Sequence, residues 1–234
     1  MRRRGIVRSG GGRELVITID GPAGAGKSVA ARELARRLGF RLVDTGALYR
    51  ALAWAVRRAG VDPADARALG DVLARTRVEL RDERVFVDGR DVTGEIRTPE
   101  ISRLTSLLTT LGPVRDKLTP LQRALAAPGG AVLEGRDTGS VVWPEAEVKF
   151  YLDADLETRA RRRRQDLLAQ GVEMDLAAVA ADVAERDRQD RERVLAPLRR
   201  PDGALVVDTS RRSLEEVVEG MLKVVEQARC CTGS

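Results

Sequence analysis

The chain of 234 residues contains no histidine, which excludes histidine-based acid–base catalysis and histidine metal ligands. Its two cysteines, Cys230 and Cys231, are adjacent and close to the C-terminus, so they provide neither a disulfide framework nor a metal-binding spacing. No apolar run approaches the roughly 18 residues that a membrane-spanning helix needs, so no membrane partner is expected. Together these absences favour a protein of the cytoplasm.

Aromatic residues are also scarce, at 3% of the chain. The 41 basic residues exceed the 36 acidic ones and give a net charge of +5, which is compatible with binding to nucleic acid. However, a surface that stacks on bases needs aromatic side chains, and acidic residues alternate with the arginines along most of the chain. We therefore expect no nucleic-acid partner and keep a non-enzymatic nucleic-acid-binding module as an alternative.

Five short apolar segments are typical of buried strands, and longer segments with helical patterns separate them. This alternation predicts an α/β fold in which a five-stranded parallel sheet is flanked by helices. Ligands of such sheets bind at the carboxyl ends of the strands. The expected strands span 16–20, 41–44, 131–134, 148–153 and 204–208, and the expected helices span 29–38, 47–59, 114–126, 156–169, 176–194 and 214–228.

Two segments interrupt this alternation. Residues 61–112 contain short β-like pieces and a hairpin turn signal at Asp88-Gly89, which predicts a small inserted domain. Residues 159–175 begin as an arginine-rich helical segment that leads to a loop at Gln170-Gly171. This pattern indicates either a mobile lid over a phosphate site or a solvated helix face. The remainder divides into a flexible basic tail at 1–13, a core at 14–60 and 113–228, and a C-terminal tail at 229–234.

A phosphate-binding motif lies between the first expected strand and the first expected helix. Its glycines allow backbone N–H groups to surround an anion, and the start of the helix adds a positive dipole. Lys27 can reach the terminal phosphates of ATP, and the Ser28 hydroxyl can hold Mg²⁺. The motif fits G-x-x-x-x-G-K-[ST], and the residues expected to bind ATP are Gly21, Pro22, Ala23, Gly24, Ala25, Gly26, Lys27, Ser28 and Val29.

The rest of the chain narrows the class of nucleotide-binding protein. It has no Asn-Lys-x-Asp guanine motif and no room for a large mechanical domain, which leaves a small kinase. A kinase brings two anionic substrates together, so its acceptor site needs arginines to neutralise them. Arg50 and Arg136 follow the second and third expected strands, and further arginines lie in the run 185–193. These arginines are candidates for contacts with an acceptor phosphate.

The chain resembles the bacterial cytidylate kinases, which are nucleoside monophosphate kinases, from about Glu14 to Ala228. The resemblance implies a P-loop kinase fold in which 61–112 is the monophosphate-binding domain and 159–175 is the lid. It implies ATP as phosphoryl donor, Mg²⁺ as cofactor and CMP or dCMP as acceptor, and we expect a monomer. Another small P-loop kinase, for shikimate, thymidylate or a different acceptor, is the alternative. The motifs that carry the resemblance are 19–28, 44–50, 91–97, 134–139 and 185–191.

The resemblance also implies roles for individual residues. Lys27, Arg136 and Arg193 are expected to be catalytic. Arg159 and Arg163 of the lid would approach the ATP phosphates, and Glu134 would lie near the metal. The expected CMP contacts are Ser106, Arg115 and Asp137 at the cytosine edge, Arg186, Asp190 and Thr45 near the ribose, and Arg50, Arg136 and Arg193 at the phosphate.

Overall fold

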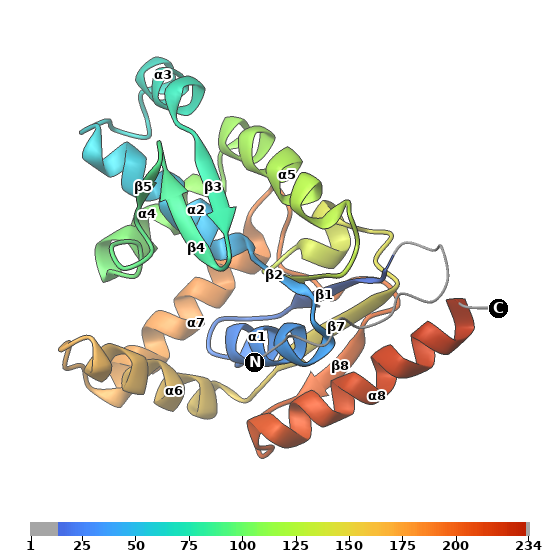
Figure 1. The fold of residues 1–234 in the computed structure, drawn as a ribbon. Coiled ribbons are helices and arrows are strands. Elements are labelled where there is room, and N and C mark those ends of the chain that lie inside the picture. The colour runs from blue at the N-terminus through green and yellow to red at the C-terminus, as the bar shows by residue number, and fades with distance from the viewer. Residues whose placement is uncertain (1–13, 233–234) are drawn as a thin grey trace, which may run out of the picture.

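The computed structural model describes residues 14–232, and the expected basic tail at 1–13 lies outside the described residues, as do residues 233–234. A sheet of five parallel strands forms the centre of the molecule (Figure 1), as the sequence predicts. Its strands are β1 (Val16–Asp20), β2 (Arg41–Asp44), β6 (Ala131–Glu134), β7 (Val148–Asp153) and β8 (Leu205–Asp208), and their order is β2-β6-β1-β7-β8.

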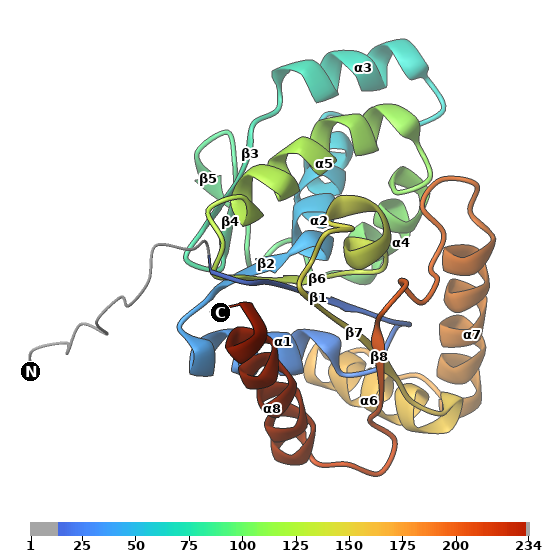
Figure 2. The same ribbon diagram turned by 90° about the vertical axis from the view of Figure 1, so that its right-hand side faces the viewer.

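Helices cover both faces of this sheet (Figure 2). On one face, α1 (Lys27–Leu38) and α8 (Leu214–Thr232) pack on the strands through a cluster that includes Leu34, Phe150 and Val218. On the other face, α5 (Gly112–Ala126) and a short π-helical turn, η1 (Thr138–Val142), cover residues such as Val16 and Leu133. Burial on both faces explains why the central strands β1 and β6 are almost continuous apolar runs, whereas the edge strand β8 is largely exposed.

Local signals explain where the helices begin and end. Helix α1 lies between Gly26 and Gly39, which have φ angles of 83° and 69° that favour glycine. Helix α8 begins with a reciprocal cap: the Glu216 backbone N–H donates to the Ser213 hydroxyl, and the Ser213 N–H donates to the Glu216 carboxylate at 2.8 Å. This cap was predicted, but α8 continues to Thr232, so residues 229–232 are helical and not part of a tail.

Residues 61–112 contain a three-stranded antiparallel sheet of β3 (Val78–Arg81), β4 (Arg84–Val87) and β5 (Arg90–Asp91). The predicted turn at Asp88-Gly89 joins β4 to β5, with φ angles of 51° and 81°. Apolar side chains of this sheet form one hydrophobic cluster with α5 and with α2 (Thr45–Arg58), which follows β2.

Two helices in this segment were not predicted, α3 (Ala66–Arg75) and α4 (Pro99–Leu108). Both have cap signals that the sequence contains. The Asp65 side chain accepts the Ala68 backbone N–H at 2.9 Å, and the Thr98 hydroxyl accepts the Ile101 N–H at 3.3 Å. The β-like segments between them led the sequence to predict strands, and no helices, in this region.

Helices α6 (Leu156–Ala169) and α7 (Leu176–Glu192) pack against each other at one end of the sheet (Figures 1 and 2). Their contact is a separate small cluster of Ala160, Leu167, Val179 and Val183. Residues 170–175 connect them. Across the described range 14–232, no helix combines the length and the apolar composition needed to cross a membrane.

Candidate active site

A cavity of about 540 Å³ opens at the carboxyl ends of the strands, between the phosphate loop, α2, α4, α6 and α7. The structure thus brings together residues that are far apart in sequence. Gly21, Pro22 and Arg159 are not among the residues that line it. The expected site residues that do line it are Ala23, Gly24, Ala25, Gly26, Lys27, Ser28, Val29, Thr45, Arg50, Ser106, Arg115, Arg136, Asp137, Arg163, Arg186, Asp190 and Arg193.

The phosphate loop packs so closely on its neighbours that two of its glycines cannot be replaced without movement. A Cβ atom on Gly21 would lie 1.9 Å from the Leu152 carbonyl oxygen of β7. A Cβ atom on Gly24 would lie 2.9 Å from the Arg159 carbonyl oxygen of α6, and both glycines have positive φ angles. The loop is therefore held between the sheet and the first turn of α6.

Lys27 is almost fully buried at the bottom of the cavity. Its ammonium group donates a hydrogen bond of 2.7 Å to the Pro22 carbonyl oxygen and lies 4.0 Å from the Glu134 carboxylate. Burial and the positive charge of Arg136 lower the pKa of Lys27 to about 7, and the nearby Glu134 carboxylate opposes this shift. A phosphate beside Lys27 would therefore stabilise its charged form.

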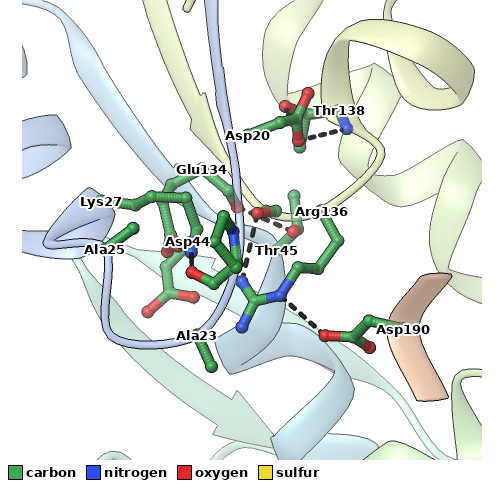
Figure 3. A network of polar contacts seen from close by, with 12 residues as sticks. Asp20, Ala23, Ala25, Lys27, Asp44, Thr45, Glu134, Arg136, Thr138 and Asp190 are labelled. Carbon is green, nitrogen blue, oxygen red and sulfur yellow. Dashed lines mark hydrogen bonds and ion pairs between the residues drawn. The ribbon is translucent and has the colours of Figure 1, made fainter. Parts of the chain in front are cut away.

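Two buried carboxylates lie at the ends of the central strands. Asp20 accepts hydrogen bonds from the Thr138 backbone N–H at 2.8 Å, the Thr138 hydroxyl at 2.9 Å and the Gly139 N–H at 2.7 Å (Figure 3). Burial nevertheless raises the pKa of Asp20 to about 6. Burial and the nearby Asp44 also raise the pKa of Glu134. Asp20 connects β1 to the turn that follows β6, which also carries Arg136 and Asp137.

Arginines and aspartates alternate around the part of the cavity that lies between α5, the turn after β6 and α7. Arg136 reaches from the end of β6 toward α7, where its Nε donates to Asp190 at 3.0 Å (Figure 3). Arg193 lies 3.8 Å from Asp190 and donates to Asp137 at 3.4 Å, and Arg115 donates to the same Asp137 carboxylate. One carboxylate thus joins α5, the turn after β6 and the end of α7.

Arg186 is less completely partnered. Its Nε has no hydrogen-bond partner within residues 14–232. Burial and the nearby Arg136 lower the pKa of Arg186 to about 10. A half-buried cation whose Nε lacks a partner is costly, so its position in the cavity indicates an anionic ligand.

Three other expected residues lie in the cavity wall with intramolecular partners. The Arg50 side chain donates to the Asp44 carboxylate at 3.2 Å. The Thr45 hydroxyl donates to the Glu134 carbonyl oxygen at 2.8 Å, and the Ser106 hydroxyl donates to the Ser102 carbonyl oxygen at 3.3 Å. Contact with a nucleotide would require these groups to share or exchange a partner.

Sequence reasoning missed several cavity residues, of which Tyr49, Arg162 and Thr209 are the most informative. Arg162 of α6 donates to the Thr209 carbonyl oxygen at 2.8 Å and to the Thr209 hydroxyl at 3.0 Å. Thr209 follows β8, so the rule that ligands gather at the carboxyl ends of strands could have found it. Arg162 lies within a run of four arginines, where sequence alone does not distinguish one from the next.

A phosphate-binding loop and an arginine-lined pocket, together at the carboxyl ends of a five-stranded parallel sheet, define a P-loop kinase, a phosphotransferase. Comparison with known proteins identifies the family. The cytidylate kinase family model matches residues 17–227. The chain belongs to the cytidylate kinase family, a family of nucleoside monophosphate kinases.

Individual relatives support this assignment. A cytidylate kinase of Symbiobacterium thermophilum is 48% identical, over 91% of this chain and 96% of the relative. One of Mycobacterium leprae is 45% identical, over 92% of this chain and 96% of the relative. The solved structure of an uncharacterized protein from Eubacterium ventriosum has a TM-score of 0.52 and 12% identity, over 92% of this chain and 99% of that chain. At this identity, the last similarity concerns the fold alone.

Proposed function

We propose that this protein transfers the γ-phosphoryl group of ATP to CMP or dCMP, giving ADP and CDP or dCDP. The observation that carries this function is the single cavity that joins the phosphate loop to the arginines and aspartates of the acceptor side. Family membership supports the same reaction. We infer further that the protein acts as a monomer in the cytoplasm, and that nucleic acid is not a substrate.

On the donor side, the loop from Gly21 to Val29 binds the ATP phosphates, and Lys27 leaves the Pro22 carbonyl oxygen to contact them. Mg²⁺ fits this site only in company with the nucleotide. Within residues 14–232, no group of three or more acidic or cysteine side chains is arranged to hold a metal. Phosphate oxygens, the Ser28 hydroxyl and water would then complete the ion's shell, as is usual for Mg²⁺. A bound ion would supply positive charge beside the transferred group.

On the acceptor side, Arg115 and Asp137 present donor and acceptor groups to the edge of a cytosine ring, with Ser106 beside them on α4. Cytosine offers an amino donor next to acceptor atoms, so this pair can satisfy both. Uracil has a carbonyl oxygen in place of the amino group, so the Asp137 carboxylate would face an acceptor and lose the hydrogen bond that cytosine offers. We place the ribose near Thr45, Arg186 and Asp190.

The acceptor phosphate contacts Arg50, Arg136 and Arg193 in this proposal. Arg136 lies between the two sides, near both Lys27 and Asp190, so it can stabilise the charge that develops during transfer. Phosphoryl transfer needs positioning and charge neutralisation more than a general base. Segment 61–112 is the domain that binds the nucleoside monophosphate. Segment 159–175 is a lid that, with Arg163 and its neighbours, closes over ATP and excludes water.

An assay of ADP release with a panel of acceptors tests this function. We expect CMP and dCMP to be preferred over UMP by tens to thousands-fold in kcat/KM, or about 2–4 kcal/mol. Asp137→Asn should raise KM for CMP and reduce this preference. Comparable kcat/KM for CMP and UMP would refute the proposed acceptor site, and activity with shikimate or thymidylate alone would identify a different small kinase.

A further inference from the structure

The phosphate loop has a second set of contacts, on the side away from the cavity. Both polar groups of the Ala23 backbone are held there by side chains of α6 and α7. The Ala23 N–H donates to the Asp187 carboxylate at 3.3 Å, and the Ala23 carbonyl oxygen accepts from the Arg159 guanidinium at 3.2 Å. Arg159 and Asp187 also form an ion pair with each other. The three residues form a closed triangle of polar contacts.

Further contacts fix this triangle. The Arg159 Nε donates to the Ala154 carbonyl oxygen at 2.9 Å, which orients the guanidinium group. The backbone of Arg159 supports Gly24, where a Cβ atom would be too close. The side chains of Arg159 and Asp187 are only 7% and 3% exposed. Burial of an ion pair is costly, and apolar residues of similar volume often give equal or greater stability.

We propose that Arg159 and Asp187 are a positioning pair that sets the affinity for the nucleotide phosphates without touching them. Sequence resemblance implies that Arg159 approaches the ATP phosphates, whereas in the structure Arg159 does not line the cavity and its guanidinium contacts Ala154, Ala23 and Asp187. The pair holds the Ala23 peptide in place, so that the loop N–H groups converge on one point before ATP arrives. Such preorganisation raises affinity by reducing the ordering cost of binding.

The same pair connects the donor loop to the helix of the acceptor side. Asp187 lies in α7 between Arg186 and Asp190, which both line the cavity. Movement of α7 relative to the sheet would therefore displace the Ala23 peptide through its hydrogen bond to Asp187. This role rests on the proposed function only in taking ATP as the nucleotide and CMP as its partner.

Four variants test the pair: Arg159→Met, Asp187→Leu, Asp187→Asn and the double variant R159M/D187L. Isothermal titration calorimetry with MgATP at about 10 °C, on protein shown to be folded by circular dichroism, gives the dissociation constant. We expect each of the first two variants and the double variant to bind MgATP about tenfold more weakly. Asp187→Asn keeps an oxygen for the Ala23 N–H, so it should lose less affinity than Asp187→Leu.

Stability separates a positioning role from a purely structural one. Each single variant leaves a buried charge unpaired, whereas the double variant removes both charges and should regain most of the lost thermal stability. Its affinity should stay low, because Ala23 still lacks its partners. The matched control is Arg36→Met, which removes an exposed arginine in the last turn of α1 that pairs with Glu33 and should leave affinity unchanged.

Two results would overturn the positioning role. One is a dissociation constant for MgATP within twofold of the wild-type value in any folded form of Arg159→Met, Asp187→Leu or the double variant. The other is affinity that recovers with stability in the double variant. Failure of the wild type to phosphorylate CMP would instead refute the proposed function, and the MgATP titrations would still decide the role of the pair.

Discussion

Lys27 should take up a proton when ATP binds. In the empty site, burial and the charge of Arg136 lower its pKa to about 7 from an ordinary value of 10.5. A bound triphosphate brings several negative charges next to the ammonium group and should return the pKa to its ordinary range or above it. Between these two pKa values, the complex holds a proton that the empty protein lacks.

The size of the effect follows from the two protonation states. With a pKa of about 7, Lys27 in the empty protein is about half protonated at pH 7 and about one-tenth protonated at pH 8. ATP binding should then take up about 0.5 proton at pH 7 and about 0.9 proton at pH 8. Because protonation is coupled to binding, the dissociation constant should rise about 50-fold between pH 7 and pH 9.

Calorimetry measures this uptake directly. MgATP is titrated without acceptor near pH 8 in buffers that differ in ionisation enthalpy. The slope of the observed binding enthalpy against the buffer ionisation enthalpy gives the number of protons taken up. At this pH the ATP phosphates are already ionised, and so is Asp20, whose pKa is about 6. Lys27→Arg is the control, because arginine stays charged and should bring the slope close to zero.

An uptake below about 0.2 proton near pH 8 would show that Lys27 is already charged in the empty protein. An unchanged slope in Lys27→Arg would show that another group takes up the proton. An affinity that is constant between pH 7 and pH 9 would refute the reasoning independently of calorimetry. In each case, the hydrogen bond to the Pro22 carbonyl oxygen and the nearby Glu134 would have offset the cost of burial.

Three further predictions concern stability and activity. Arg186→Met removes a half-buried, incompletely partnered charge, so thermal melting should show equal or higher stability, while kcat/KM for CMP should fall at least 100-fold; a fall in both would contradict this assignment. Gly139→Ala would place a Cβ atom 2.6 Å from the Thr18 hydroxyl and should cost about 1–3 kcal/mol in denaturant unfolding. Gly220→Ala on the exposed side of α8 meets no neighbour and should instead add about 1 kcal/mol with unchanged turnover; a loss of stability there would be unexpected.

The elements of the main sheet were predictable because their signals are local. The apolar runs of β1, β2, β6 and β7 begin and end in the structure where the sequence predicts them. The phosphate loop was predictable for the same reason, since its motif is continuous in sequence. Helices α3 and α4 were not predicted although Asp65 and Thr98 cap them. The short strand-like segments between them are the stronger local signal, so the sequence predicts strands in this region.

The phosphate-loop motif and the alternation of strands and helices can be read from local sequence, and they locate the edge of the sheet where ligands bind. Which arginines face the cavity depends on how distant segments pack. Arg159 and Arg162 lie three residues apart on α6, yet the first contacts Ala23 and Asp187 and the second lines the cavity. Ion pairs and the pKa of Lys27 depend on burial and on groups distant in sequence, so local pattern cannot determine them.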